Sequence, residues 1–239
     1  MKLYTSVEIA PSARKIGYGD KILLLGSCFA ANIGAKFAEH YFQTTINPLG
    51  TLYNPASIAL SITDSRHPIP DSQLIYHNGL WHSMMHHGTF SGKDKAAVQA
   101  RCLDGYERLQ RALKEATTVI VTFGTAWVYE MDGQVVANCH KQPSSLFRRE
   151  LLSVDECVEA LERIVAHAPR RVLFTLSPIR HIGDGLEDNS LSKSTLRVAI
   201  DRVCKAHPER VQYFPSYEIM LDDLRDYRFY SSDMLHPSD

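Results

Sequence analysis

The chain lacks the features that would indicate a membrane span or a nucleic-acid partner. No apolar run approaches the roughly 20 residues that cross a bilayer, and the opening MKLYTSVEIAPSARK has no apolar signal-peptide core. Its 26 Lys and Arg residues are balanced by 27 Asp and Glu residues and form no basic block. The chain therefore offers few contacts to the phosphate backbone of a nucleic acid. We therefore expect a cytoplasmic protein with no membrane span and no nucleic-acid partner.

Cysteine is scarce and shows no pairing pattern. The five cysteines are widely spaced and include no CxxC motif, so free thiols fit better than disulfides or a structural zinc site. His82 and His86 have the spacing of a zinc pair on a helix. However, glycines surround them and no third ligand is evident, so pocket-lining or surface histidines are the simpler interpretation. We expect no metal and no cofactor.

Apolar runs alternate with helical patterns along the 239 residues. The patterns predict strands at 21–26, 117–124, 171–178 and 210–216, and helices at 27–42, 55–65, 93–116, 153–167 and 190–206. Residues 47–55 and 66–91 show no regular period, and 127–138 is typical of a β-hairpin turning at Asp132-Gly133. This alternation favours an α/β fold with a parallel sheet covered on both faces. No shift in composition marks a boundary, so we expect one domain over residues 1–239.

The stretch GSCFA, residues 26–30, joins the first predicted strand to the first predicted helix. Ligands of an open parallel sheet bind at the carboxyl ends of its strands. Ser27 at this point would lie beside helix amides that favour a developing oxyanion, or it would be a helix N-cap without catalytic duty. Cys28 is the alternative nucleophile, because a helix N-terminus activates thiols; its ordinary role would be that of a small buried residue.

The far end of the chain supplies a base and an orienting carboxylate. The segment DMLHP places Asp233 and His236 three residues apart. This spacing lets the carboxylate fix the imidazole tautomer and leaves the other ring nitrogen for a nucleophile. DxxH is weak alone, but it gains weight beside a Gly-Ser pair in an α/β chain. Together these residues indicate a triad of Ser27, His236 and Asp233.

Several further segments extend the pattern over residues 26–237. With GSCFA, the segments NPLGTLYNP, TFGTAWVYE, NCHKQP, SPIRHIGDG, NSLSKSTLR and YFPSYEIMLDDLRDYRFYSSDMLHP resemble the GSCFA family, among the SGNH or GDSL-like esterases and acyltransferases. The resemblance implies a three-layer α/β/α sandwich of flavodoxin-like SGNH hydrolase fold, with a mainly parallel sheet and here a small β-hairpin insertion. Ser27 would be the nucleophile, His236 the general base and Asp233 its orienter. Similar proteins continue past the final His-Pro pair, so we expect a chain truncated after Asp239.

The resemblance also implies an oxyanion hole, with one departure from the pattern. Its first two donors would be the Ser27 amide and Gly50. SGNH enzymes carry an Asn as the third donor, where this chain has Ala126. The replacements we consider are the hydroxyl or amide of Thr125 and the side chains of Asn47 and Asn54. An unreplaced donor would cost roughly 10² to 10³ in turnover.

Five residues are candidates for substrate binding, and three of them lie at predicted strand ends: Gly124, Arg180 and His181. The other two are His87 and His140. Arg180 and His181 suit a carboxylate or phosphate, with an ordinary surface role equally expected. Trp81, Trp127 and Tyr129 suit either a sugar-stacking wall or the core.

We expect a serine esterase or O-acyltransferase that acts on a small acyl ester, with acetyl as the expected acyl group, of a small molecule or carbohydrate. The alternative is a catalytically inactive binding domain of the same fold. Hydrolysis and transfer would use the same residues, so the sequence does not separate them. It carries no signature of the oligomeric state.

Overall fold

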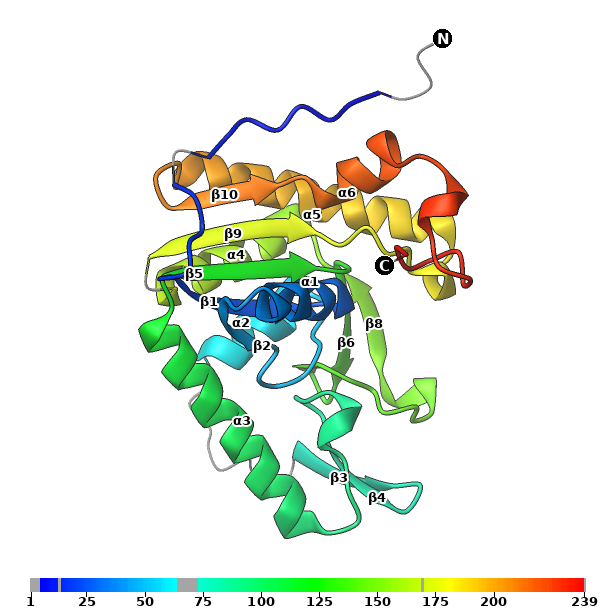
Figure 1. Ribbon diagram of the computed structural model, residues 1–239. Helices are drawn as coiled ribbons and strands as arrows, with labels where there is room; N and C mark the ends of the chain where they lie inside the picture. The colour runs from blue at the N-terminus through cyan, green and yellow to red at the C-terminus, as the bar shows by residue number, and fades with distance from the viewer. Residues whose placement is uncertain (1–4, 13, 64–72, 169, 239) are drawn as a thin grey trace.

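The computed structural model describes residues 5–12, 14–63, 73–168 and 170–238. Its centre is a five-stranded sheet of β1 (Lys21–Gly26), β2 (Gln43–Ile46), β5 (Thr118–Phe123), β9 (Arg171–Leu176) and β10 (Val211–Phe214). The strands pair in parallel in the order β10-β9-β5-β1-β2 (Figure 1). Taken in chain order this is 2-1-3-4-5, the doubly wound order of flavodoxin-like folds. The predicted α/β class with a parallel sheet is confirmed.

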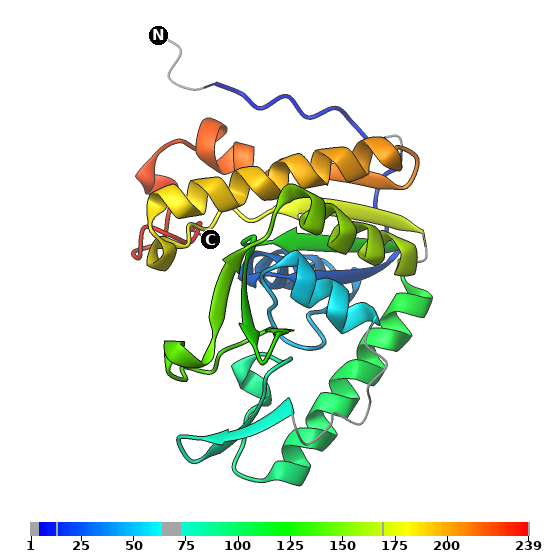
Figure 2. The same ribbon diagram turned by 180° about the vertical axis from the view of Figure 1, so that it is seen from behind.

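Helices cover the sheet on both faces and complete a three-layer sandwich. They are α1 (Cys28–Glu39), α2 (Pro55–Thr63), α3 (Lys95–Glu115), α4 (Val154–His167), α5 (Leu186–Ala206) and the short α6 (Ser216–Glu218). On one face, Ile22, Leu24 and Ile120 pack against Ile33 and Phe37 of α1. The face turned to the viewer in Figure 2 is covered by α2, α4 and α5. Within the described ranges, no helix has both the length and the apolarity that a membrane crossing needs.

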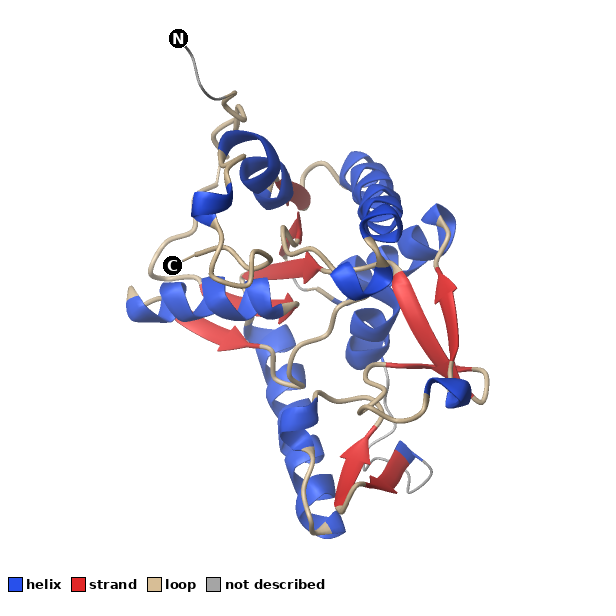
Figure 3. Ribbon diagram, turned by 90° about the vertical axis from the view of Figure 1, so that its right-hand side faces the viewer, coloured by secondary structure: helices blue, strands red, loops and turns tan. Residues whose placement is uncertain are grey.

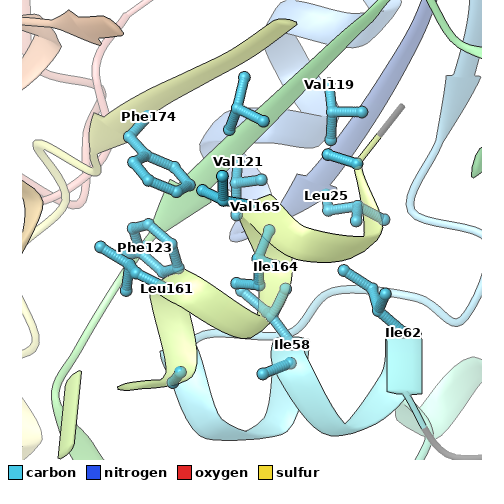
Figure 4. Packing of buried hydrophobic residues seen from close by; sticks show 14 of the residues in the cluster. Leu25, Ile58, Ile62, Val119, Val121, Phe123, Leu161, Ile164, Val165 and Phe174 are labelled. Atoms are coloured by element: carbon cyan, nitrogen blue, oxygen red, sulfur yellow. The ribbon is translucent and has the colours of Figure 1, made fainter. Parts of the chain in front are cut away.

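The larger core lies between the sheet and the helices α2 and α4 (Figure 4). All six residues of β5 are buried, as expected for a strand that is covered on both faces. Phe123 of β5 and Phe174 of β9 face Leu161 and Ile164 of α4, and all four are fully buried. Burial of one such side chain contributes about 1.5 to 3 kcal/mol, so this layer holds the carboxyl ends of the strands in place.

Two small antiparallel sheets stand outside the central one. In the first, β6 (Trp127–Met131) pairs with β7 (Gln134–Val136) and β8 (Arg148–Leu151). Asp132 and Gly133 form the turn between β6 and β7 with φ of 52° and 75°, as a type I′ hairpin requires. The predicted hairpin is confirmed, and β8 extends it to three strands. The second sheet pairs β3 (Leu74–His77) with β4 (Leu80–Ser83) beside the start of α3, far from the central sheet (Figure 1).

Several predicted boundaries differ from the structure. The predicted helix 27–42 spans Cys28–Glu39, and the polar strand β2 follows it, where the sequence pattern predicts no strand. Residues 66–91, expected to be irregular, include β3, β4 and a short 3₁₀ turn at Gly88–Phe90. The last long helix begins at Leu186, four residues before the predicted start at 190. The helix predicted at 55–65 ends at Thr63, and residues 64–65 lie outside the described ranges.

Candidate active site

The turn after β1 is built around a glycine that no other residue could replace without strain. Gly26 has φ of 123°, and a Cβ atom at this position would lie 2.1 Å from the Thr122 carbonyl oxygen. Its amide donates to Oδ1 of Asn47 at 2.9 Å. These contacts direct the chain from β1 into α1 at the carboxyl edge of the sheet, which faces the viewer in Figure 3.

Ser27 occupies the N-cap of α1 but makes no capping hydrogen bond with its side chain. The residue is 1% exposed, and its hydroxyl has no hydrogen-bond partner among the described residues. Its backbone amide donates to the Thr122 carbonyl at 3.1 Å. The amide is therefore committed to the sheet, and it is not the free oxyanion donor that the family resemblance implies.

Cys28 is the first residue of α1 and is half-buried. Its Sγ lies 3.8 Å from Nε2 of His236. Burial raises the pKa of the Cys28 thiol, although the amides of Phe29 and Cys28 and the Lys193 ammonium act in the opposite direction. Of the two nucleophile candidates, Cys28 is the one that contacts the imidazole.

Asp233 and His236 form the predicted pair. Oδ2 of Asp233 lies 2.5 Å from Nδ1 of His236. The other carboxylate oxygen accepts from the amides of Leu235 and His236 and from the Ser231 hydroxyl, at 2.8 to 3.0 Å. These hydrogen bonds, led by the His236 amide, hold the pKa of Asp233 far below its usual value. An ionised carboxylate can only accept, so Nδ1 carries the proton and Nε2 is left as a base facing Cys28.

Arg180 holds the segment that carries this pair. Its guanidinium donates to the Met234 carbonyl and lies 5.4 and 5.1 Å from the rings of Tyr227 and Tyr230. Met234 itself has φ of 58°, so the turn between Asp233 and His236 is tight. Arg180, a candidate for substrate binding, is bound in the structure to the chain's own C-terminal segment and also lines a cavity next to it.

A cavity of about 630 Å³ opens between the head of α1, the β6 hairpin and the C-terminal segment. Five predicted site residues line it: Ser27, Thr125, Arg180, His181 and His236. Its lining includes the aromatic residues Trp127, Tyr129, Tyr53 and Phe147. Trp127 and Tyr129 are two of the three residues considered for a sugar-stacking surface; the third, Trp81, lies on β4 and outside the lining. The site thus combines a base, two candidate nucleophiles and a largely apolar chamber.

Besides Asp233, which contacts His236, four of the predicted residues lie outside the lining of this cavity. Gly50 packs against Cβ of His87, and its amide donates to the Asn47 carbonyl at 2.8 Å. The His87 ring caps the turn at Thr89, and His140 hydrogen-bonds the Ser83 carbonyl at 2.7 Å.

Gly124, the fourth, packs against the rings of Tyr53 and His181. Gly50, His87 and His140 are engaged in contacts outside the cavity lining, whereas Gly124 lies behind two side chains that belong to the lining. The sequence indicates the strand end at Gly124, but it does not indicate these partners.

The amides and hydroxyl proposed at Thr125 are also engaged. The amides of Gly124 and Thr125 both donate to the Tyr53 carbonyl, at 2.7 and 3.1 Å. The Thr125 hydroxyl lies 3.0 Å from that of Ser192 and accepts from the Trp127 amide at 3.1 Å. Thr125 therefore shapes the cavity wall, and its polar groups serve the fold.

Asn54 is the donor candidate that remains in the lining. Its Oδ1 accepts from the Ser57 amide at 2.7 Å, so the side-chain orientation is determined and the NH₂ group is left as a donor on a residue that lines the cavity. By contrast, Asn47 uses Oδ1 for Gly26 and is outside the lining. Of the replacements considered for the missing third donor, Asn54 fits best.

Lys193 is a buried lysine beside the site, in the segment NSLSKSTLR, to which sequence patterns assigned no role. It is 1% exposed, and its Nζ donates to the Ser177 carbonyl at 2.7 Å. Burial lowers the pKa of Lys193 to about 7. One signal was available: Lys193 shares the helical stripe of the buried residues Asn189, Leu196 and Ile200.

Burial, together with the nearby Lys193 and His236 and against the opposing effect of Asp184, also lowers the pKa of His181, to about 4. His181 is therefore neutral at pH 7. A neutral imidazole in the cavity wall does not supply the positive charge expected of a group that binds a carboxylate or phosphate.

The histidines considered for a zinc pair are not on a helix. His82 lies on β4, with Nδ1 2.7 Å from the Ser91 hydroxyl and Nε2 3.1 Å from the His77 carbonyl. His86 lies 2.8 Å from the Ser83 hydroxyl through Nδ1. The helical spacing argument therefore does not apply to them.

Fold and site together define an α/β protein with a cavity at the switch point of a doubly wound sheet, where a helix N-terminus meets a His-Asp pair. The sequence model of the GSCFA family matches residues 21–239. The chain therefore belongs to the GSCFA family, as its motifs indicated. No curated protein and no solved structure matches it.

Proposed function

We propose that this protein is an acyl-transfer enzyme of SGNH type, either a carboxylic ester hydrolase or an O-acyltransferase. One observation carries the proposal. The Asp233–His236 pair presents Nε2 to the head of α1 in the lining of a cavity large enough for a small ester. A base oriented by a carboxylate and facing a nucleophile at a helix N-terminus is the arrangement that covalent acyl transfer needs.

The reaction proceeds in two steps that share one base. A nucleophile of the Gly26–Cys28 turn attacks the ester carbonyl carbon while Nε2 of His236 accepts its proton. The Asn54 NH₂ group and the N-terminal dipole of α1 stabilise the oxyanion. The carbon–oxygen bond to the alcohol then breaks, and His236 returns the proton to the departing alkoxide.

Water or a second alcohol resolves the acyl-enzyme with His236 again acting as base. The predicted substrates are acetyl esters of small molecules or carbohydrates. The aromatic wall of Trp127 and Tyr129 supports this choice, because aromatic faces pack well against sugar rings. The sequence predicts Ser27 as the nucleophile of this scheme.

The test compares p-nitrophenyl acetate turnover in the wild type, His236→Gln and a matched control. The control is His207→Gln, which breaks another His-carboxylate pair, with Glu162 at 2.7 Å. Loss of a general base costs about 10² to 10⁴ in rate, so we expect that loss for His236→Gln and wild-type turnover for His207→Gln. A folded wild type that is neither acylated nor turned over would overturn the proposal in favour of a binding domain.

A further inference from the structure

We infer that the nucleophile of this site is the thiol of Cys28, and not the hydroxyl of Ser27. The inference rests on the proposed acyl transfer and specifies its reacting atom. Sγ of Cys28 lies 3.8 Å from Nε2 of His236, a hydrogen-bond distance for sulfur. Both residues line the cavity, so a bound ester would reach the thiol and its base together.

The surroundings of Ser27 do not activate its hydroxyl. A serine becomes a nucleophile when a neighbouring base shares its proton. The Ser27 hydroxyl is buried and has no hydrogen-bond partner among the described residues, His236 included. The turn thus offers His236 a thiol and leaves the adjacent hydroxyl without a base.

Three groups around Cys28 favour its thiolate, and burial opposes them. The amides of Phe29 and Cys28 at the N-terminus of α1 hydrogen-bond the sulfur, and Lys193 in its charged form acts in the same direction. Burial outweighs these effects and raises the thiol pKa. The resting site therefore holds a neutral thiol, and His236 removes its proton during the attack.

The chemical step balances without a co-reactant. The S–H proton moves to Nε2 of His236 as sulfur bonds to the carbonyl carbon. The carbon–oxygen bond of the ester breaks, the alcohol leaves with the proton from His236, and a thioester remains on Cys28. Water or an acceptor alcohol then attacks the thioester, which restores the thiol.

The experiment locates the acyl group on the wild-type protein, so it does not depend on a variant that folds. The enzyme is mixed with p-nitrophenyl acetate, quenched in acid, digested and mapped by mass spectrometry. Neutral hydroxylamine then separates thioesters, which it cleaves readily, from oxygen esters. We expect a hydroxylamine-labile acetyl group on Cys28.

Variants provide the second readout. Cys28→Ala should lower the acylation rate by more than about 10³-fold, as removal of a catalytic nucleophile does. Ser27→Ala should still form the adduct on Cys28. Cys204→Ser, on α5 and outside the cavity lining, is the control for general thiol loss.

The outcomes separate the two proposals. An acetyl group on Ser27, retained in Cys28→Ala, would overturn the thiol assignment and leave the acyl-transfer function standing. A folded wild type without an adduct at either residue would overturn both.

Discussion

Replacement of Gly26 by alanine should damage stability and the site together. A Cβ atom on residue 26 would lie 2.1 Å from the Thr122 carbonyl oxygen, a contact that real Cβ atoms do not make. Because the obstacle is backbone of the central strand β5, no side chain can rotate away. The start of α1, which carries Ser27 and Cys28, has to move.

The cost has two parts. The backbone at φ of 123° is one that only glycine adopts readily, and such strain costs roughly 1 to 3 kcal/mol. The steric displacement adds to this, so we expect a loss of at least about 3 kcal/mol in the free energy of unfolding. For a chain of this size, that loss lowers Tm by roughly 6 to 12 °C.

Two other glycines separate these contributions. Gly133 has φ of 75° and no atom within 4 Å of the place that a Cβ would take, whereas Gly19 has open space and no positive φ. Gly133→Ala should therefore cost about 1 kcal/mol for backbone strain alone, and Gly19→Ala should be neutral. Thermal and urea unfolding followed by circular dichroism measure all three variants. If Gly26→Ala were no less stable than Gly133→Ala, the close packing of β1 on β5 would not be the reason for a glycine at residue 26.

Two further predictions concern the titratable groups of the site. Asp233→Asn should lower kcat by about 10² to 10⁴ with little change in KM, because an amide NH₂ cannot accept the Nδ1 proton and favours the wrong tautomer of His236. Glu162→Gln is the matched control. An unchanged kcat in folded Asp233→Asn would refute the orienting role of Asp233. Between about pH 6.5 and pH 4 the unfolded chain binds a proton at His181 that the folded chain, whose His181 pKa is about 4, does not. The wild type should therefore lose roughly 2 to 3 kcal/mol of stability from this residue as the pH falls through that window. Urea midpoints measured at pH 6.5 and pH 4 should not show this loss for His181→Gln, whereas the variant of an exposed histidine, His40→Gln, should behave as the wild type. An equal pH dependence of the wild type and both variants would contradict a buried, neutral His181.

Local patterns predicted the central elements well, because each carried its own signal. The all-apolar run of β5, the capping box formed by Ser153 and Glu156 at α4, and the Asp132-Gly133 turn can each be identified from a few neighbouring residues. The strands β2 and β3 carried no such signal. Their short, mixed sequences form strands because a neighbouring strand supplies the hydrogen bonds.

The sequence predicted only the local part of the candidate site, because contacts between distant residues leave no short sequence pattern. Asp233 and His236 are three residues apart, so their contact is a local event. The choice between Ser27 and Cys28 depends on where a residue 208 positions away places its ring. The burial of Lys193 under the cavity depends on how α5 packs, which no short pattern contains.

By itself, the sequence determined the α/β class, the family, the Gly26 turn and the His-Asp pair, because these follow from local hydrophobic period, backbone freedom and short spacing. The tertiary structure alone decided which groups are free to act. It commits the amides of Ser27, Gly50 and Thr125 to backbone partners, and it leaves the Asn54 NH₂ group and the Cys28 thiol at the cavity. The physical reason is that a donor satisfied by one partner is no longer available to another, and such partners come from distant parts of the chain.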